Sequence, residues 1–431
     1  MPGRACHYSR GMTTHRSRPA LALTSAAALA GLLSACAGAS PASSAKSVSP
    51  GAASSAAAPA SAGRSSAAGT ADAPPAPSAD PGAASCVDRV FSKLTEAQRV
   101  GQLFLVGMAS DSAGPATAAA EREYHFGSVL FASDTSEGAK AAAATTSYVQ
   151  ALATPAITGG VRFFVAANQE GGKVQNLKGP GFTDMPSALT QGSWSTSYLR
   201  RQAAGWGGEL RSAGVNFDLA PVMDVVPAGT ASTNAPIGQL DREFGSTAAG
   251  NGAHGAAFIQ GMASAGVATS AKHFPGLGRV TGNTDFTANV VDSVTTPDDP
   301  DLATYRSAVS AGVPFMMVAL ATYTKIDPSR LAVFSPTVMR LLRSTTGFRG
   351  VILSDDLGDA AAVASIPKTQ RAISFLDAGG DMITSQSFPP AEQMASAVLS
   401  RASSDPSFRA TVDAAAKKVL AAKQSYGLLP C

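Results

Sequence analysis

An alternation of short apolar runs with amphipathic, alanine-rich stretches between residues 86 and 431 most constrains the fold. The runs have the length of buried strands, whereas the stretches between them have helical spacing and usually end at a glycine. Eight such units predict a single (β/α)8 barrel, an α/β fold, with an open doubly wound sheet as the alternative. The expected strands cover residues 100–106, 127–131, 162–167, 215–221, 267–272, 314–319, 350–354 and 381–384, and the clearest helices cover residues 197–213, 247–265, 302–311, 336–345 and 369–378.

The residues before the barrel begin with a targeting segment. Residues 1–35 contain a positively charged flank and an apolar stretch from Ala20 to Leu33, which is short for a membrane span. The following sequence, Leu33-Ser34-Ala35-Cys36, resembles the lipobox of bacterial lipoproteins. That resemblance implies cleavage before Cys36 and attachment of lipid to its thiol. A plain secretory signal cleaved near Ala35 is the alternative.

Residues 36–85 are expected to form a linker. After Cys36 they are almost entirely Ala, Ser, Pro and Gly, with no Leu, Ile, Phe, Tyr or Trp to bury. Such a composition behaves as a coil with a span of roughly 40 Å. We therefore expect an exported domain, residues 86–431, lipid-anchored to the outer face of the cytoplasmic membrane.

Charge and cysteine content exclude several functions. Four of the 33 Lys and Arg residues precede Cys36, where no acid occurs, so 29 bases face 30 acids in the rest of the chain. A near-neutral body without a basic run argues against nucleic acid as a partner, and only the lipid anchor is expected to contact a membrane. Four scattered cysteines form no zinc motif. We expect no metal, no organic cofactor and no protein partner.

Polar clusters lie at the ends of several expected strands. They run Asn168-Gln169-Glu170-Gly171-Gly172-Lys173-Val174-Gln175, then residues 214–225, Asp241-Arg242-Glu243-Phe244-Gly245, Lys272-His273-Phe274-Pro275-Gly276-Leu277-Gly278 and Ser354-Asp355-Asp356-Leu357. In this order the segments resemble glycoside hydrolase family 3, in particular its single-domain bacterial β-N-acetylglucosaminidases, which act on peptidoglycan fragments. The resemblance covers nearly all of the folded part and implies a barrel with its active site at the carboxyl ends of the strands.

The resemblance makes Asp355 the catalytic nucleophile. The residue follows the apolar run Gly350-Val351-Ile352-Leu353, so a strand is expected to hold its carboxylate at the mouth of the barrel. A retaining glycosidase needs a carboxylate beneath the anomeric carbon and a second group that protonates the leaving oxygen. An Asp that caps the next helix is the alternative, but Asp356 can take that role.

The second catalytic group departs from the family pattern. Single-domain members usually carry Asp-Ser-His after the fifth strand, where the histidine is the acid/base, whereas this chain reads Asn283-Thr284-Asp285. One interpretation makes Asp285 the acid/base, with a pKa raised by burial or by the Asp355 charge. The other is that the loop has lost its acid, which leaves an enzyme for good leaving groups or a sugar-binding protein. In the first case the Asp285 charge favours water over phosphate as acceptor.

Sugar binding is assigned to four residues through the resemblance. The family's Lys-His pair and arginine hold sugar hydroxyls and correspond to Lys272, His273 and Arg242. Asn168 replaces a family aspartate and is expected to bind a hydroxyl as a neutral group. The alternatives are ion pairs at a strand end for Lys272 and His273, and with Asp241 or Glu243 for Arg242. Glu170 and Asp224 are expected to tie loops together rather than to catalyse.

The two cysteines of the folded part open and close it. Cys86 begins the domain and Cys431 ends it, and the first and last units of a closed barrel are neighbours. We therefore expect a disulfide between them in an exported protein, with two unpaired thiols as the alternative.

These features together predict a retaining exo-glycosidase that hydrolyses terminal β-linked N-acetylglucosamine, in particular from peptidoglycan-derived material. A weakened cell-wall-sugar-binding lipoprotein and a β-glucosidase of the same family are the alternatives.

Overall fold

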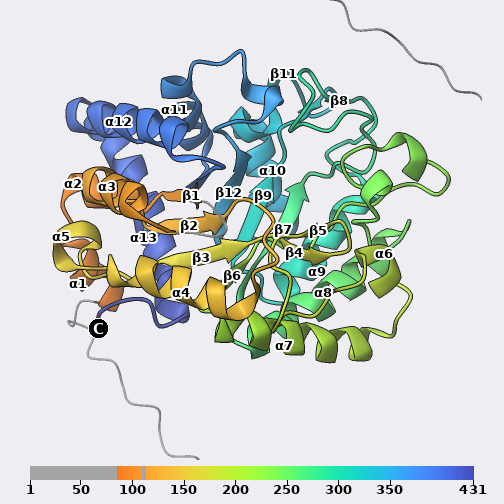
Figure 1. Cartoon of the computed structure of the whole chain (residues 1–431). Coiled ribbons are helices and arrows are strands. Elements are labelled where there is room, and N and C mark those ends of the chain that lie inside the picture. The colour runs from red at the N-terminus through yellow and green to blue at the C-terminus, as the bar shows by residue number, and fades with distance from the viewer. Residues whose placement is uncertain (1–84, 109–112) are drawn as a thin grey trace, which may run out of the picture. The chain divides into compact units, whose positions relative to one another are not determined.

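A computed structural model describes residues 85–108 and 113–431 (Figure 1). The signal segment, the proposed lipidation site Cys36 and the linker apart from Ser85 lie outside the described residues. Among the residues that the structure describes, no helix combines the length and apolar character needed to cross a bilayer.

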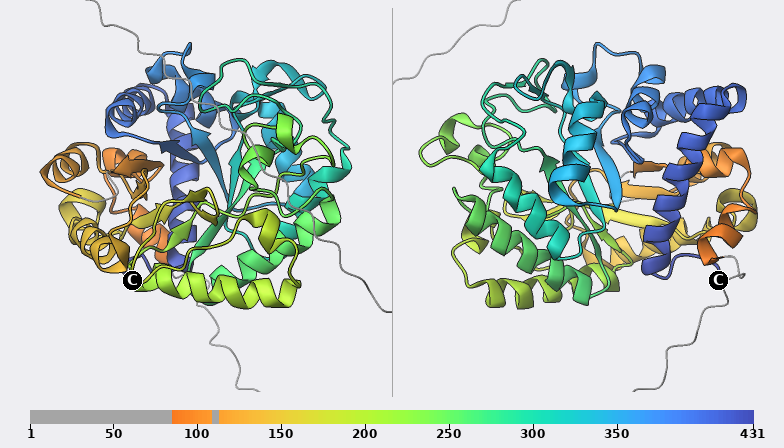
Figure 2. Two further views of the ribbon diagram at one scale, coloured as in Figure 1. Left: turned by 45° about the vertical axis from the view of Figure 1, so that its right-hand side comes forward. Right: turned by 180° about the vertical axis from the view of Figure 1, so that it is seen from behind.

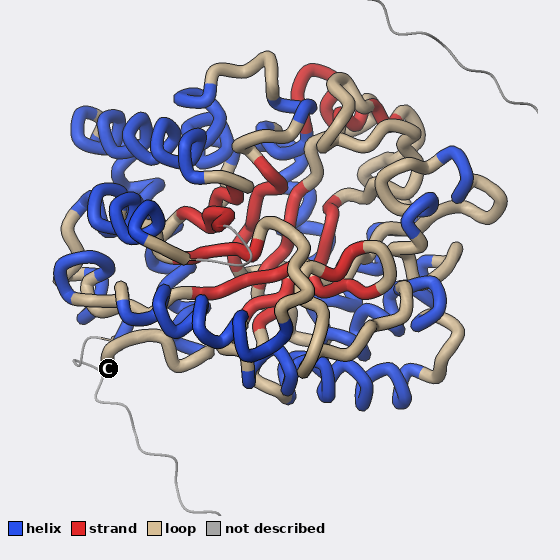
Figure 3. Tube along the Cα trace, viewed as in Figure 1, coloured by secondary structure: helices blue, strands red, loops and turns tan. Residues whose placement is uncertain are grey.

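A closed barrel of eight parallel strands forms the centre of the molecule (Figure 3). Each predicted apolar run overlaps one of its strands, so the predicted (β/α)8 fold is confirmed. The first run was predicted to begin too early, because Val100 and Gly101 end a helix and the strand begins at Phe104. The strands, in the order around the barrel, are β1 (Phe104–Met108), β13 (Met382–Ser385), β12 (Val351–Asp356), β9 (Phe315–Val318), β7 (Ala268–Phe274), β6 (Phe217–Asp218), β3 (Phe164–Ala167) and β2 (Ser128–Phe131).

Helices surround the barrel on the outside (Figure 2). Several begin at a side-chain cap, such as Ser195 before α7, Thr247 before α8 and Ser335 before α10. All five predicted helices are present within two residues of the expected bounds. The helices are α1 (Cys86–Phe91), α2 (Glu96–Gly101), α3 (Pro115–Tyr124), α4 (Gly138–Ala151), α5 (Pro155–Thr158), α6 (Ala188–Gln191), α7 (Thr196–Ser212), α8 (Ala248–Ser264), α9 (Ala303–Ser310), α10 (Pro336–Thr346), α11 (Lys368–Ala378), α12 (Phe388–Ser404) and α13 (Pro406–Ser425).

Short elements on the loops at the carboxyl ends of the strands add to the barrel. β4 and β5 form a hairpin after β3, while β8, β10 and β11 form a separate three-stranded sheet. These pieces lengthen the loops in which a barrel enzyme carries its active site. Their bounds are β4 (Gln169–Gly171), β5 (Val174–Gln175), β8 (Val291–Asp292), β10 (Thr322–Tyr323) and β11 (Asp327–Leu331), with 3-10 turns at Ala231–Thr233, Gly238–Leu240, Pro300–Leu302, Ala332–Phe334 and Ala361–Val363.

Aromatic side chains fill the interior of the barrel. Phe164 on β3 and Phe315 on β9 are separated in the sheet by β6 and β7, yet their ring centroids lie 5.4 Å apart. Phe217 on β6 lies 4.3 Å from Phe315 and completes the cluster. Val165, next to Phe164, belongs to a different cluster that includes helix residues. The strands are therefore buried on both faces, which explains why they read as continuous apolar runs.

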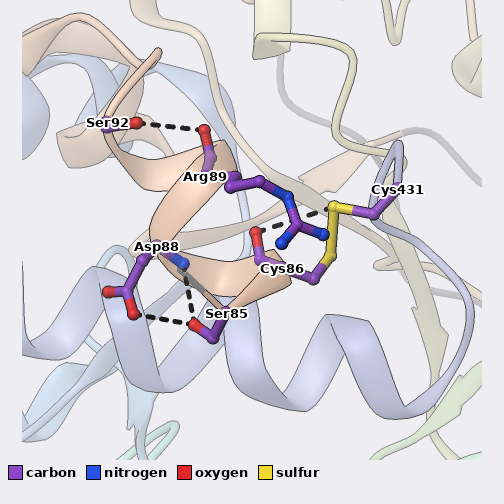
Figure 4. Close-up of a disulfide and its surroundings, with 6 residues drawn as sticks. All are labelled: Ser85, Cys86, Asp88, Arg89, Ser92 and Cys431. Carbon is purple, nitrogen blue, oxygen red and sulfur yellow. Dashed lines mark hydrogen bonds between the residues drawn. A yellow bond between two sulfur atoms is a disulfide. The ribbon is translucent and has the colours of Figure 1, made fainter. Parts of the chain in front are cut away.

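A disulfide joins the two ends of the barrel domain, as predicted (Figure 4). The Cα atoms of Cys86 and Cys431 lie 6.1 Å apart, and 345 positions separate them in the sequence. Nearby, the backbone N–H of Arg162 donates to the carbonyl of Leu428, just before β3 begins. The disulfide thus lies at the amino ends of the strands, the end opposite to the expected active site.

We predict that the double variant Cys86→Ser/Cys431→Ser lowers the free energy of unfolding by about 2–4 kcal/mol, because the unfolded chain loses a constraint over nearly the whole domain. Thermal unfolding without reductant measures the change. Addition of reductant to the wild-type protein should reproduce it. An unchanged melting temperature in both experiments would contradict a stabilising disulfide.

Candidate active site

A pocket with a volume of ≈ 220 Å³ opens at the carboxyl ends of the barrel strands. All six residues predicted to catalyse or to bind sugar line it, although they come from four different strands and their loops. This convergence is what the barrel topology predicts for polar residues at strand ends. The lining residues are Asn168, Val174, Leu219, Pro236, Leu240, Arg242, Lys272, His273, Leu277, Asn283, Thr284, Asp285, Phe286, Met317, Asp355, Thr384 and Gln386.

Irregularities in two strands bring site residues into the pocket. Between β7 and β9 the register shifts between Ala271 and Phe274, and Lys272 and His273 lie within that shift. Between β12 and β13 a similar shift falls between Leu353 and Asp356, around Asp355. A β-bulge re-aims side chains that regular alternation would point elsewhere. This explains how the consecutive residues Lys272 and His273 both line one pocket.

A buried carboxylate holds two of the predicted sugar-binding cations. Glu170 Oε2 and Oε1 each accept a 2.8 Å hydrogen bond from Arg242, and Lys272 Nζ lies 2.6 Å from Glu170 Oε1. Burial opposes the charge of Glu170, but the two cations outweigh it and lower its pKa to about 2. The carboxylate therefore stays ionised and fixes both cations, as expected for a residue that ties loops together.

The cations keep donors for a ligand. Arg242 also donates to the carbonyl of Pro236, which leaves two of its five N–H groups, and Lys272 donates to Asn168 Oδ1 at 2.9 Å. Arg242 pairs with Glu170 rather than with Asp241 or Glu243, so that alternative is wrong. Lys272 does form an ion pair, with Glu170, as the alternative expected, and it also lines the pocket.

His273 is oriented by a second buried carboxylate. Its Nδ1 lies 2.8 Å from Asp224 Oδ2, and its backbone N–H donates to Asp224 Oδ1 at 3.0 Å. Leu277 N–H and the Tyr305 hydroxyl also donate to Asp224. Burial raises the pKa of Asp224, but the interactions with His273 and the N–H of Leu277 outweigh burial and hold the pKa below its ordinary value. Because Asp224 uses Nδ1, Nε2 is the ring nitrogen that a ligand can reach. Asp224 is thus a positioning residue, as expected.

Asp355 and Asp356 have different surroundings despite being neighbours. Asp355 is half-buried at the pocket, and within the described residues the N–H of Asp356 is the one donor to its Oδ1. Asp356 is buried and accepts the backbone N–H groups of Gly358, Asp359 and Gln386 at 2.9–3.1 Å. Burial raises the pKa of Asp356 to about 6. Asp356 therefore stabilises the turn after β12, and Asp355 faces the pocket. The predicted helix cap at Asp356 is wrong, because the 3-10 turn Ala361–Val363 and α11 both begin without a side-chain cap.

The loop of Asp285 is attached to the segment that follows Asp355. Ala361 N–H donates to the carbonyl of Asp285, and Ala362 N–H donates to the carbonyl of Thr284, each at 3.1 Å. Within the loop, Asn283 Oδ1 accepts the N–H of Asp285 at 2.9 Å. Asn283 therefore supports the turn, and the Asp285 carboxyl enters the pocket from a fixed backbone.

Asp285 has a raised pKa. Its side chain can be reached by water through the mouth, but the surrounding protein removes part of its hydration. This desolvation raises the pKa, the charge of Asp355 raises it further, and Arg242, His273 and Lys272 act in the opposite direction. One carboxyl that favours its proton beside another is the arrangement of two-carboxylate glycosidases.

Sequence reasoning missed part of the pocket wall. Thr384 lies in the eighth strand, β13, and Gln386 directly follows it, while Phe286 and Met317 add apolar surface. The position of these two polar residues at the end of an apolar run was an available signal, since the other site residues were found in this way. The part of the chain that the structure describes holds no group of three or more metal-ligating side chains.

The fold and the site together define a glycoside hydrolase: a (β/α)8 barrel whose mouth holds two carboxyl groups and a set of fixed hydrogen-bond donors. Residues 95–422 match the model of the glycosyl hydrolase family 3 N-terminal domain. The chain belongs to glycoside hydrolase family 3.

Characterised relatives and solved structures agree with this membership. The chain is 32% identical over 327 residues to the β-hexosaminidase LpqI of Mycobacterium tuberculosis. The aligned region covers 72% of this chain and 78% of LpqI. It is 32% identical over 320 residues to a β-N-acetylglucosaminidase/β-glucosidase of Cellulomonas fimi. This alignment covers 71% of this chain and 53% of the relative. The crystal structure of a β-N-acetylhexosaminidase from Beutenbergia cavernae has a TM-score of 0.75 and 45% identity, and covers 77% of this chain and 99% of its own.

We predict that Glu170→Gln lowers the free energy of unfolding by about 3 kcal/mol near neutral pH, because two buried cations lose their countercharge. The pKa of Glu170 lies below its ordinary value, so its contribution is present above about pH 4.5 and is lost as the pH falls towards 2. Chemical denaturation at several pH values should show the two proteins converge in acid. The exposed Glu137→Gln is the control, and a pH-independent difference for Glu170→Gln would contradict the electrostatic cause.

Proposed function

We propose that this protein is a retaining β-N-acetylhexosaminidase that releases terminal β-linked N-acetylglucosamine through a covalent intermediate on Asp355. One observation carries the proposal: Asp285 and Asp355 line the same pocket, and the charge of Asp355 helps to raise the pKa of Asp285. The pair can therefore supply one proton donor and one nucleophile at the same pH.

The reaction takes two steps. In the first, a carboxylate oxygen of Asp355 bonds to the anomeric carbon while the bond to the leaving oxygen breaks and that oxygen takes the proton of Asp285. In the second, Asp285 removes a proton from water, the water oxygen bonds to the anomeric carbon, and the bond to Asp355 breaks. Arg242, Lys272, His273 and Asn168 hold the hydroxyls of the sugar throughout.

The joined loops support this division of labour. Because Ala361 and Ala362 donate to the backbone of the Asp285 loop, the acid and the nucleophile are fixed relative to one another by short connections. Pre-set separation of two catalytic groups reduces the entropy lost in reaching the transition state. Asp285 thus takes the place of the histidine that relatives carry on this loop.

The substrate is inferred from the relatives. Proteins named β-hexosaminidase or β-N-acetylhexosaminidase are similar to this chain over most of its folded part. We propose peptidoglycan-derived N-acetylglucosaminides as the natural source, in keeping with an exported protein. The Cellulomonas fimi relative is named as both a β-N-acetylglucosaminidase and a β-glucosidase, which makes β-glucosides the second candidate.

We further propose that the protein is exported and lipid-anchored through Cys36 at the outer face of the cytoplasmic membrane. The lipobox-like sequence before Cys36 supports the anchor. The linker joins the domain beside Cys86, where the amino ends of the strands lie, so its point of attachment is on the far side of the barrel from the pocket. Labelling of the chain with radioactive palmitate, lost in Cys36→Ala, tests this.

We predict that Asp355→Ala lowers kcat/KM on the order of 10⁴-fold or more for every substrate, because the covalent route is lost. The measurements use an aryl β-N-acetylglucosaminide and the disaccharide of N-acetylglucosamine and N-acetylmuramic acid. Mass spectrometry of the wild-type protein after reaction with a slow-turnover fluorinated N-acetylglucosaminide should find the sugar on Asp355. An active Asp355→Ala protein, or an adduct elsewhere, overturns the assignment.

We predict that Asp285→Asn lowers kcat/KM for the disaccharide about 100- to 1000-fold but leaves kcat/KM for N-acetyl-β-glucosaminyl fluoride nearly unchanged, because fluoride departs without a proton and kcat/KM reports only the steps up to its departure. Asp285 must be protonated to act, so wild-type activity on the disaccharide falls as the pH rises through the pKa of Asp285. The raised pKa moves this fall to higher pH, and the variant should lack it.

The same assays decide among the alternatives. Cleavage of the fluoride but not of the disaccharide by the wild-type protein would show that the loop has lost its acid. Cleavage of neither would identify a sugar-binding protein.

A further inference from the structure

Phe286 is far more exposed than the other large apolar side chains of the described residues. Its exposed fraction is 83%, while the next most exposed large apolar side chain, Val294, reaches 52%. Phe286 also lines the active-site pocket and directly follows Asp285. A large ring exposed at the mouth of a binding site indicates a surface that a ligand covers.

The backbone holds this ring in place. The N–H of Phe286 donates to the carbonyl of Asn283 at 3.1 Å, and the N–H of Thr287 donates to the same carbonyl at 2.8 Å. The loop is further attached through the carbonyls of Thr284 and Asp285 to the segment after β12. Phe286 therefore extends from a closed turn, so little backbone entropy is lost when a ligand covers the ring.

The pocket has a polar floor and an apolar rim. The side chains of Glu170, Lys272 and His273 are only 3–6% exposed, which places the charged groups deep in the site. Val174 and Leu240 are more accessible and line the same pocket as Phe286. A sugar whose hydroxyls reach the floor would leave the group beyond its glycosidic oxygen among these rim residues.

We infer that Phe286 is the platform on which the ring of the leaving group stacks, and that this ring is a pyranose. The inference rests on the proposed function, in which Asp285 protonates the glycosidic oxygen, because the group bonded to that oxygen must then lie next to Phe286. A β-linked glucopyranose carries its substituents at the edge and presents C–H groups on its faces. Such a face is complementary to the negative face of an aromatic ring. Phe286 thus selects disaccharides over glycosides with small leaving groups.

The test compares two substrates with the same N-acetylglucosamine donor. Diacetylchitobiose has a pyranose as leaving group, and N-acetyl-β-glucosaminyl fluoride has none. We expect Phe286→Ala in the full chain to raise KM for diacetylchitobiose about tenfold, through loss of the covered apolar surface, and to leave both kinetic constants for the fluoride unchanged.

Matched variants separate stacking from structure. Phe286→Trp should restore a low KM for the disaccharide. Tyr198→Ala, which removes an exposed aromatic ring of α7 outside the pocket, should affect neither substrate. An equal loss on both substrates, or an unchanged KM for the disaccharide in Phe286→Ala, overturns the inference. A wild-type protein that cleaves neither substrate instead overturns the proposed function.

Discussion

The site depends on one buried carboxylate that forms ion pairs with two cations. Glu170 comes from the loop after β3, Lys272 from β7 and Arg242 from the loop after β6, so their ion pairs join three parts of the barrel mouth. Removal of Glu170 would leave two buried cations without this countercharge, which is costly. The cations can therefore remain deep in the pocket with free N–H groups, and those N–H groups are what a sugar hydroxyl requires.

The mouth of the barrel assigns different roles to chemically similar acids through their surroundings. Cations lower the pKa of Glu170 to about 2, burial raises that of Asp356 to about 6, and desolvation with the Asp355 charge raises that of Asp285. Arg242 and Lys272 act against the raised pKa of Asp285. Arg242 and Lys272 are also the partners of Glu170, so the same two cations belong to the structural ion pairs and to the surroundings that set the pKa of Asp285.

The sequence predicted the strands because each is buried on both faces along most of its length and therefore belongs to a mainly apolar run. The error at Val100 arose because α2 leads directly into β1, and periodicity does not separate two adjoining buried segments. The meeting of Asp355, Asp285 and the binding residues was predictable from strand ends. The register shifts around Lys272 and Asp355 were not, since they depend on pairing between strands, and neither was the exposure of Phe286.

The structure separates what stabilises the barrel from what acts on substrate. The disulfide joins the two ends of the barrel domain at the amino side of the strands. The apolar rings of Phe164, Phe217 and Phe315 fill the interior of the barrel. The opposite side carries costly features: buried ion pairs, shifted strand registers and an exposed aromatic ring. Stability of the fold does not explain these features, because well-packed apolar side chains of similar volume often replace a whole buried ion-pair set at no cost, and an exposed ring buries little apolar surface. Their concentration around one pocket is best explained by the requirements of the ligand: donors at the floor, two carboxyls at the bond, and an apolar face beyond it.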